Sequence, residues 1–214
     1  MTNLKDKPWY RLNIITENAI RNDFDFNEKF ILNRDFDLWR FGYFNGSTAH
    51  QSIFNKDWIE YFESLGFIIT QGELFRRLPN TVNRDRAHVD IISNESPKKI
   101  CFALNWIIND VIDEGEMIWY EVPPMDQMKY DQVKMEDEVG QTYGYWPKEL
   151  YIDKEIDRVI IGKQATLVRT DLLHNVEASK SVRACISLRS FVPGLNSFST
   201  WDEAIDKLKN LIIE

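Results

Sequence analysis

Sulfur ligands and imidazoles are scarce in this chain of 214 residues, which contains two cysteines and three histidines. Cys101 and Cys185 are too few for a disulfide framework, and they fit a reducing, cytoplasmic compartment. They have no Cys-x-x-Cys spacing and lie in apolar segments, which gives little support to a structural zinc site. With so few ligands, the positions of the three histidines largely determine which metal site the chain could form.

The sequence also has no long apolar run and no excess of positive charge. No run approaches the roughly 18–20 apolar residues needed to span a bilayer, and Met1–Pro8 lacks the apolar core of a signal peptide. Formal net charge is −8, whereas a bulk electrostatic binder of nucleic acid needs a positive surface. We therefore expect neither membrane nor bulk nucleic-acid partners.

The composition is that of an ordinary globular protein, with 43% apolar and 28% charged residues. No repeat, low-complexity tract or linker divides the chain, so we predict a single domain over 1–214. Its expected parts are supporting helices and strands over 1–66, a β core over 67–192 and a C-terminal helix within 193–214.

Two helices are predicted outside the β core. The first runs from a cap at Asn55 to a stop at Gly66, with an apolar face between them. The second begins at Thr200, where Thr200-Trp201-Asp202-Glu203 has the form of a capping box. We expect both helices to pack against the core rather than to carry chemistry.

Between these helices the sequence is typical of short β-strands. Lys99–Asn109 contains CFALNWII, an apolar run that suits a strand buried on both faces. Val182–Val192 alternates polar and apolar residues. Further strands are predicted at 67–70, 116–121, 158–161 and 165–168. Strands at this spacing favour an antiparallel sandwich or barrel, so we predict an α+β protein that is mainly β.

One long stretch, 123–150, has no clear period. It is polar, acidic and aromatic, with MEDEVGQTYGYWP at its centre. A long segment without a pattern is usually functional or mobile. Two interpretations stay open: a lid or wall of a substrate site, or a surface insertion with its own cluster around Tyr143, Tyr145 and Trp146.

The metal-ligating candidates are His88, Asp90 and His174. His88 and Asp90 lie two residues apart, so on a strand they point to the same face, although a partly exposed His–Asp pair explains them equally well. His174 adds a second imidazole from another strand-like segment. Two histidines and one carboxylate form the facial triad of non-haem Fe(II) sites, which leaves half of the metal open. His50 has no partner that we can name.

Arg183 lies nine residues after His174. Glu177–Ser181 is predicted as a hairpin turn that returns Arg183 on the neighbouring strand, near the depth of the metal. A guanidinium inside a barrel needs a planar anion, and a dicarboxylate held by the metal at its other end would supply one. Two alternatives stay open for Arg183: a solvated strand edge, or a core carboxylate as its partner. Arg189, on the same strand face, is the alternative anion clamp.

The ordered set His88-Val-Asp90, His174 and Arg183 resembles the 2-oxoglutarate- and Fe(II)-dependent oxygenases. IINDVIDEGEMIW and ATLVRTDLLHNVEASKSVRACISLR are similar to two segments of the prolyl-hydroxylase-like members. These segments are the strand-turn-strand after the first metal strand and the closing segment. The resemblance covers Leu74–Val192, somewhat over half of the chain. The compact size and the Asn-Trp of ALNWII also resemble small oxygenases of this family from marine bacteria and their phages.

The resemblance implies a double-stranded β-helix, a jelly-roll or cupin-like core, with flanking helices and the metal inside one end. It implies Fe(II) bound by His88, Asp90 and His174, and 2-oxoglutarate whose distal carboxylate pairs with Arg183. The implied activity is that of a dioxygenase, a hydroxylase that couples oxidative decarboxylation of 2-oxoglutarate to oxidation of a C–H bond. Two alternatives stay open: a cupin-type metalloenzyme without 2-oxoglutarate, and a catalytically silent β-barrel binding module.

The resemblance also concerns the residues around the co-substrate. Asn105, on the strand after the metal strand, is implied as a polar contact. Many members have Ser or Thr two residues after the clamp Arg, where this chain has Cys185, and Ser187 is the candidate substitute. The expected substrate is a small molecule or a residue of a peptide, and the oligomeric state is not indicated.

Four arginines cluster just before the metal strand, namely Arg76, Arg77, Arg84 and Arg86. Phosphate binding normally needs a wider patch of positive charge. We therefore interpret these arginines as a solvated strand edge rather than as a nucleic-acid groove.

Overall fold

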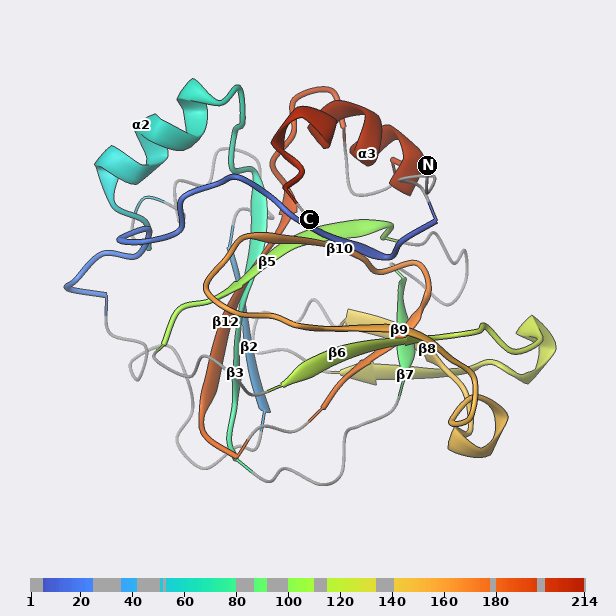
Figure 1. The fold of residues 1–214 in the computed structure, drawn as a ribbon. Helices are drawn as coiled ribbons and strands as arrows, with labels where there is room; N and C mark the ends of the chain where they lie inside the picture. Colours follow the sequence, from blue (N-terminus) through green and yellow to red (C-terminus); the bar gives the residue numbers. More distant parts are fainter. Residues whose placement is uncertain are drawn as a thin grey trace.

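Two six-stranded antiparallel sheets form the framework of the structure (Figure 1). The computed structural model describes residues 6–24, 36–41, 51, 53–79, 87–91, 100–109, 115–133, 141–177, 180–195 and 199–213. The first sheet consists of β1 (Trp9–Arg11), β10 (Thr166–Arg169), β5 (Phe102–Ile107), β12 (Arg183–Ser190), β3 (Gln71–Arg77) and β2 (Phe36–Phe41), in that spatial order. The second consists of β7 (Lys129–Val133), β8 (Gln141–Tyr145), β4 (His88–Ile91), β11 (Leu173–Val176), β6 (Glu116–Tyr120) and β9 (Glu155–Ile160). The predicted mainly β, antiparallel architecture is confirmed.

The helical segments whose bounds the structure describes are short and lie outside the sheets. They are α2 (Lys56–Ser64), α3 (Trp201–Leu208) and the 3-10 turns η2 (Met125–Gln127), η3 (Lys148–Leu150) and η4 (Lys209–Leu211). Within the part of the chain that the structure describes, no helix has the length and apolar character needed to cross a membrane.

The two sheets pack on each other through an apolar cluster on their inner faces. Ala103 and Cys185 of the first sheet meet Met117, Trp119 and Val159 of the second. Side chains alternate along β5 and β12, so their odd-numbered residues face the second sheet and their even-numbered residues face the helices. Burial of β5 on both faces confirms the prediction for Lys99–Asn109, and β12 is buried on both faces as well.

Helices α2 and α3 cover the outer face of the first sheet (Figure 1). Trp58 and Phe62 of α2 and Trp201 and Leu208 of α3 are buried in the same cluster as the even-numbered residues of β5 and β12. Burial of each large apolar side chain contributes roughly 2 kcal/mol to folding. The predicted packing role of both helices is therefore confirmed.

The two helix starts differ from each other in how they are capped. The Thr200 hydroxyl accepts a hydrogen bond from the Glu203 amide, and the Glu203 carboxylate accepts one from the Thr200 amide, which completes the predicted capping box. Asn55 occupies the predicted N-cap of α2, but its side chain makes no cap hydrogen bond. Its amide instead donates to the carbonyls of Asn18 (2.5 Å) and Ile20 (2.9 Å). The side chain of Asn55 therefore ties the helix to the N-terminal segment.

The strand prediction for 67–70 is wrong, because β3 begins at Gln71. The amides of Ile68 and Thr70 donate to the carbonyls of Phe191 and Ser190, but a register shift on β12 between Leu188 and Ser190 interrupts the ladder. The β-rich composition of residues 67–70 therefore extends beyond the segment that pairs with β12 as a regular strand.

The predicted hairpin between His174 and Arg183 is also wrong. β11 pairs with β4 and β6 in the second sheet, whereas β12 pairs with β3 and β5 in the first, so the chain crosses between sheets after Glu177. Residues 178–179 lie outside the described part. Nearly every described side chain of β11 and β12 is buried, which a surface hairpin cannot provide.

The stretch 123–150 is more regular than its sequence indicates. β7 and β8 pair as antiparallel strands, and β8 pairs with β4, so they extend the second sheet beside the histidine strand. Gly144 leaves room for the side chain of Met128, because a Cβ atom at this position would lie 2.5 Å from its sulfur. Residues 134–140 lie outside the described part. The sequences KYDQV and QTYGY do not alternate polar and apolar residues, so they show no clear strand period.

We predict that Thr200→Ala lowers the free energy of unfolding by about 1 kcal/mol, because the capping box loses its hydroxyl acceptor. Urea unfolding measures this change. Ser64→Ala is the matched control, since its exposed hydroxyl only donates to the Tyr61 carbonyl at the end of α2, and it should change stability by less than about 0.5 kcal/mol. Equal losses in the two variants would contradict the role of the cap.

Candidate metal centre

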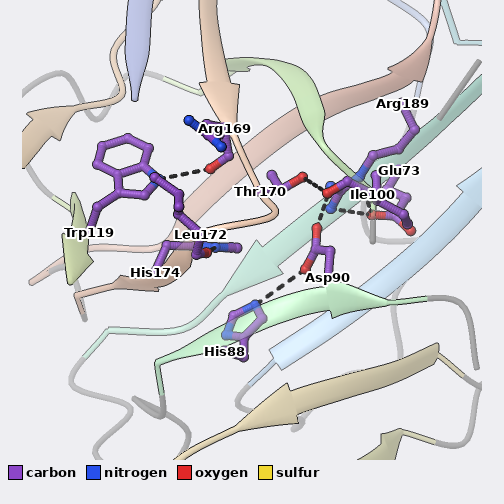
Figure 2. A network of polar contacts seen from close by, with 10 residues as sticks. All are labelled: Glu73, His88, Asp90, Ile100, Trp119, Arg169, Thr170, Leu172, His174 and Arg189. Atoms are coloured by element: carbon purple, nitrogen blue, oxygen red, sulfur yellow. Dashed lines mark hydrogen bonds and ion pairs between the residues drawn. The ribbon is translucent and has the colours of Figure 1, made fainter. Parts of the chain in front are cut away.

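His88, Asp90 and His174 come together on the inner face of the second sheet. His88 and Asp90 belong to β4, His174 belongs to the neighbouring β11, and the two histidines are direct cross-strand partners. One ligand atom of each residue lies within 4.8 Å of the others. The ring centroids of the two histidines are 4.6 Å apart, and His88 Nε2 lies 3.6 Å from Asp90 Oδ1. The structure thus brings together the three residues that the sequence singles out (Figure 2).

The group is buried on one side and open on the other. Asp90 and His174 are 1% and 4% exposed, whereas the side chain of His88 is 28% exposed. The ring of Tyr143 stands edge-on against His88, with 4.9 Å between centroids. His88 is therefore the partly exposed member of the group, and Tyr143 of the stretch 123–150 lies directly beside it.

His174 is held in the neutral form that metal binding requires. Its Nδ1 lies 2.9 Å from the Leu172 carbonyl, which can only accept, so Nδ1 carries the proton and Nε2 keeps its lone pair. Burial, together with the neighbouring His88, lowers the pKa of His174 to about 4 despite the opposing effect of Asp90. The imidazole is thus an available nitrogen ligand near neutral pH.

Asp90 is oriented by both its side chain and its backbone. Oδ2 accepts a hydrogen bond of 2.5 Å from Arg189, which leaves Oδ1 facing His88. The amide of Asp90 donates to Thr170, and its carbonyl accepts from the amide of Ile100. Burial by itself raises the pKa of Asp90, but Arg189 and the two histidines outweigh it, so the pKa lies below its ordinary value. The carboxylate is therefore charged and presents one oxygen to the centre of the group.

Arg189 also contacts a second buried carboxylate. Its Nε and Nη2 atoms lie 3.0 Å and 2.9 Å from Oε2 of Glu73 (Figure 2). Glu73 and Asp90 contribute two negative charges and Arg189 one positive charge, so this buried group carries a net charge of −1 when the imidazoles are neutral. A buried excess charge is unfavourable unless another charge balances it. A divalent cation among the three ligands would change this net charge to +1, and an anion bound with the cation would then balance it.

The turn before His174 is fixed by a set of polar contacts. Trp119 donates its indole N–H to the carbonyl of Arg169 at 2.7 Å, and the guanidinium of Arg169 pairs with Asp171 at the same distance. The hydroxyl of Thr170 donates to the carbonyl of Ile100 at 2.6 Å. These contacts join the segments on either side of the site, so β4 and β11 are held in one register.

Arg183, Asn105 and Ser187 also face the space between the sheets. Asn105 and Ser187 are cross-strand partners, and Arg183 is only 7% exposed, so the alternative of a solvated edge is wrong for it. Arg183 Nε, Asn105 Oδ1 and Ser187 Oγ are buried, and none of the three atoms has a hydrogen-bond partner among the residues that the structure describes. Gly115 makes room for the arginine, because a Cβ atom there would lie 3.0 Å from its Cδ and Nε atoms. A polar ligand would satisfy such atoms.

The interpretation of Arg76 and Arg77 as a solvated edge is wrong. Arg76 is 8% exposed, and the half-buried Arg77 donates to the carbonyl of Val176 in the opposite sheet. Both arginines lie on β3, which is paired on either side, with β12 and with β2. Arg84, Arg86 and His50 lie outside the described residues.

Glu73 is a buried charged residue that the sequence did not reveal, because its partner Arg189 is 116 residues away along the chain. Arg189 lies on the predicted strand face, but its guanidinium is tied to Asp90 and Glu73. The one signal for Glu73 in the sequence is an acidic residue directly before the apolar pair Leu74 and Phe75.

No protein-family profile, curated protein or solved structure matches this chain. Its function is therefore inferred from the chemistry of its own residues, and the group of two imidazoles and one carboxylate is suited to a metal ion.

We predict that the metal-free protein loses stability as the pH falls from about 6.5 to about 4, the ordinary and lowered pKa of His174. Unfolded chains take up a proton on His174 in this range and folded chains do not, so the loss amounts to about 3 kcal/mol. Urea unfolding at a series of pH values measures it. His174→Asn should flatten the slope in this window, and an unchanged slope would contradict the assignment.

Proposed function

We propose that this protein is an Fe(II)- and 2-oxoglutarate-dependent dioxygenase that hydroxylates a small-molecule or peptidyl substrate. The observation that carries the proposal is the juxtaposition of His88, Asp90 and His174 with unpartnered polar atoms inside the same pair of sheets. One group suits a metal ion, and the other suits an anionic ligand that reaches the metal.

The order of the strands supports a double-stranded β-helix. From β3 to β6 and again from β9 to β12, successive strands alternate between the two sheets. Such alternation winds the chain around a common interior, as in jelly-roll proteins. The ligand strands β4 and β11 lie side by side in this arrangement although they are far apart in sequence.

The donor set fits Fe(II). Two imidazoles and a single carboxylate form a mixed nitrogen and oxygen set, and three protein ligands leave three positions of an octahedral ion open. A structural zinc site would normally take four protein ligands, often cysteines. Cys185 is buried in the apolar cluster, and burial raises the pKa of its thiol, so it is a poor thiolate ligand.

The buried polar atoms fit a dicarboxylate co-substrate. Arg183 would hold the distal carboxylate, because a buried guanidinium needs an anionic partner and its Nε has none among the described residues. Asn105 and Ser187 lie beside each other on β5 and β12 and would contact the same ligand. The thiol of Cys185, between Arg183 and Ser187 on the inner face, would give this part of the site an apolar wall.

The chain's own residues would bind, orient and exclude water. When bound, Fe(II) and 2-oxoglutarate supply the oxidation, in which dioxygen gives one oxygen atom to succinate and one to the substrate hydroxyl, with release of carbon dioxide. Asp90 and the histidines hold the metal on the protein side, and Arg183 sets the direction of the co-substrate. The open side at His88 and Tyr143 is where the substrate would approach.

We predict that anaerobic titration of the protein with Fe(II) and 2-oxoglutarate produces a weak visible charge-transfer band. His174→Ala should abolish the band, because the metal loses a ligand. Arg183→Ala should still bind metal but weaken 2-oxoglutarate about 10- to 100-fold, which corresponds to the loss of a charge-assisted hydrogen bond. Arg158→Ala is the matched control, since this arginine is 47% exposed in a surface ion pair with Glu116, and it should leave the band unchanged.

The same titration separates the alternatives. Fe(II) binding that is equal in wild type and Arg183→Ala and gives no charge-transfer band with 2-oxoglutarate, together with turnover of dioxygen that does not need 2-oxoglutarate, would favour a cupin-type metalloenzyme. Absence of metal binding in the wild type would favour a silent binding module. Succinate formation over a panel of amino acids, peptides and nucleic acids would identify the substrate class.

A further inference from the structure

We propose that Glu73 is a positioning residue that acts through Arg189 on the metal ligand Asp90. The inference rests on the proposed metal centre, and it assigns a function to a carboxylate outside the ligand set. Glu73 lies on β3 of the first sheet, whereas Asp90 lies on β4 of the second, so any effect of Glu73 on the metal passes between the sheets.

The three residues form one continuous chain of contacts (Figure 2). Glu73 Oε2 accepts from Nε and Nη2 of Arg189 at 3.0 Å and 2.9 Å, which fixes the plane of the guanidinium. The remaining terminal nitrogen, Nη1, donates to Asp90 Oδ2 at 2.5 Å. Arg189 is thus held from the first sheet by Glu73 while it holds the carboxylate of the second sheet.

Glu73 is needed for charge as well as for geometry. The side chains of Glu73, Arg189 and Asp90 are 1%, 6% and 2% exposed, so their charges interact with little screening by water. Arg189 alone beside Asp90 would offset the charge of this ligand and weaken its attraction for a cation. Glu73 offsets the charge of Arg189 in turn, so Arg189 can occupy Oδ2 without cancelling the charge of Asp90.

The contact at Oδ2 also limits how Asp90 can bind. A carboxylate with one oxygen tied to a guanidinium presents a single oxygen, here Oδ1 on the side of His88. Monodentate binding by Asp90 would keep three positions of an octahedral metal free for other ligands. Partners of metal-ligating groups commonly change metal affinity 10- to 100-fold when they are replaced.

The test uses Co(II), a spectroscopically visible divalent ion, with calorimetry for affinity and visible absorption for coordination. Glu73→Gln should bind Co(II) about 10- to 100-fold more weakly than wild type, with a changed absorption spectrum. Glu116→Gln is the control, since Glu116 pairs with Arg158 at 2.6 Å away from the ligands, and it should behave as wild type. A merely structural role for Glu73 would lower the unfolding temperature without changing affinity or spectrum in the folded protein, and that result would overturn the proposal.

A double-mutant cycle tests whether Glu73 acts through Arg189. In the Arg189→Gln background, the further change Glu73→Gln should alter Co(II) affinity less than about threefold, because the connecting residue is gone. The same loss in both backgrounds would overturn the proposal.

If Glu73→Gln does not fold, Glu73→Asp replaces it. This variant keeps the charge but withdraws the carboxylate, so wild-type affinity and spectrum would overturn the proposal.

The outcomes separate this inference from the proposed function. Wild-type protein that binds no Co(II) would contradict both, since there would be no centre to position. Co(II) binding that depends on Glu73 and Arg189, in a protein whose metal complex never responds to 2-oxoglutarate, would support the inference and contradict the dioxygenase proposal.

Discussion

The structure depends on the register between β4 and β11. Two imidazoles and a carboxylate can share a buried space only if the strands that carry them are locked side by side, and here His88 and His174 are direct cross-strand partners. Hydrogen bonds among Asp90, Thr170 and Ile100 stabilise this register. Two of them join backbone groups, and the third is donated by the Thr170 hydroxyl. A one-residue slip would turn His174 to the other face of the sheet and dismantle the group.

The charge balance of the interior follows from this register. Asp90 brings a negative charge into a space with little water. Together with the positive charge of Arg189 and the negative charge of Glu73, it forms a group with a net charge of −1. Arg183 brings a positive charge to the inner face of the first sheet, and its Nε has no partner among the described residues. One cation and one dicarboxylate would satisfy both needs, which is the physical reason why a metal ion and 2-oxoglutarate suit the same interior.

Much of this could be predicted from the sequence, for reasons that differ by residue. The period of two places Arg183 and Arg189 on one face of their strand, and the capping box at Thr200 is a local pattern that the structure confirms. The pairing partners of a strand could not be predicted. The sequence before β12 is typical of a hairpin that would return β12 beside β11, yet the two strands lie in different sheets. Glu73 was missed for the same reason, since its role depends on a contact between sheets.

Pulsed electron paramagnetic resonance on protein loaded with vanadyl ion, a paramagnetic substitute for Fe(II), tests the central claim most directly because it detects the nitrogens bound to the metal. The account predicts couplings from two imidazoles in the wild type, one from His88 and one from His174, and from only one imidazole in His174→Ala. A wild-type spectrum without nitrogen couplings, or one that His174→Ala leaves unchanged, would contradict it.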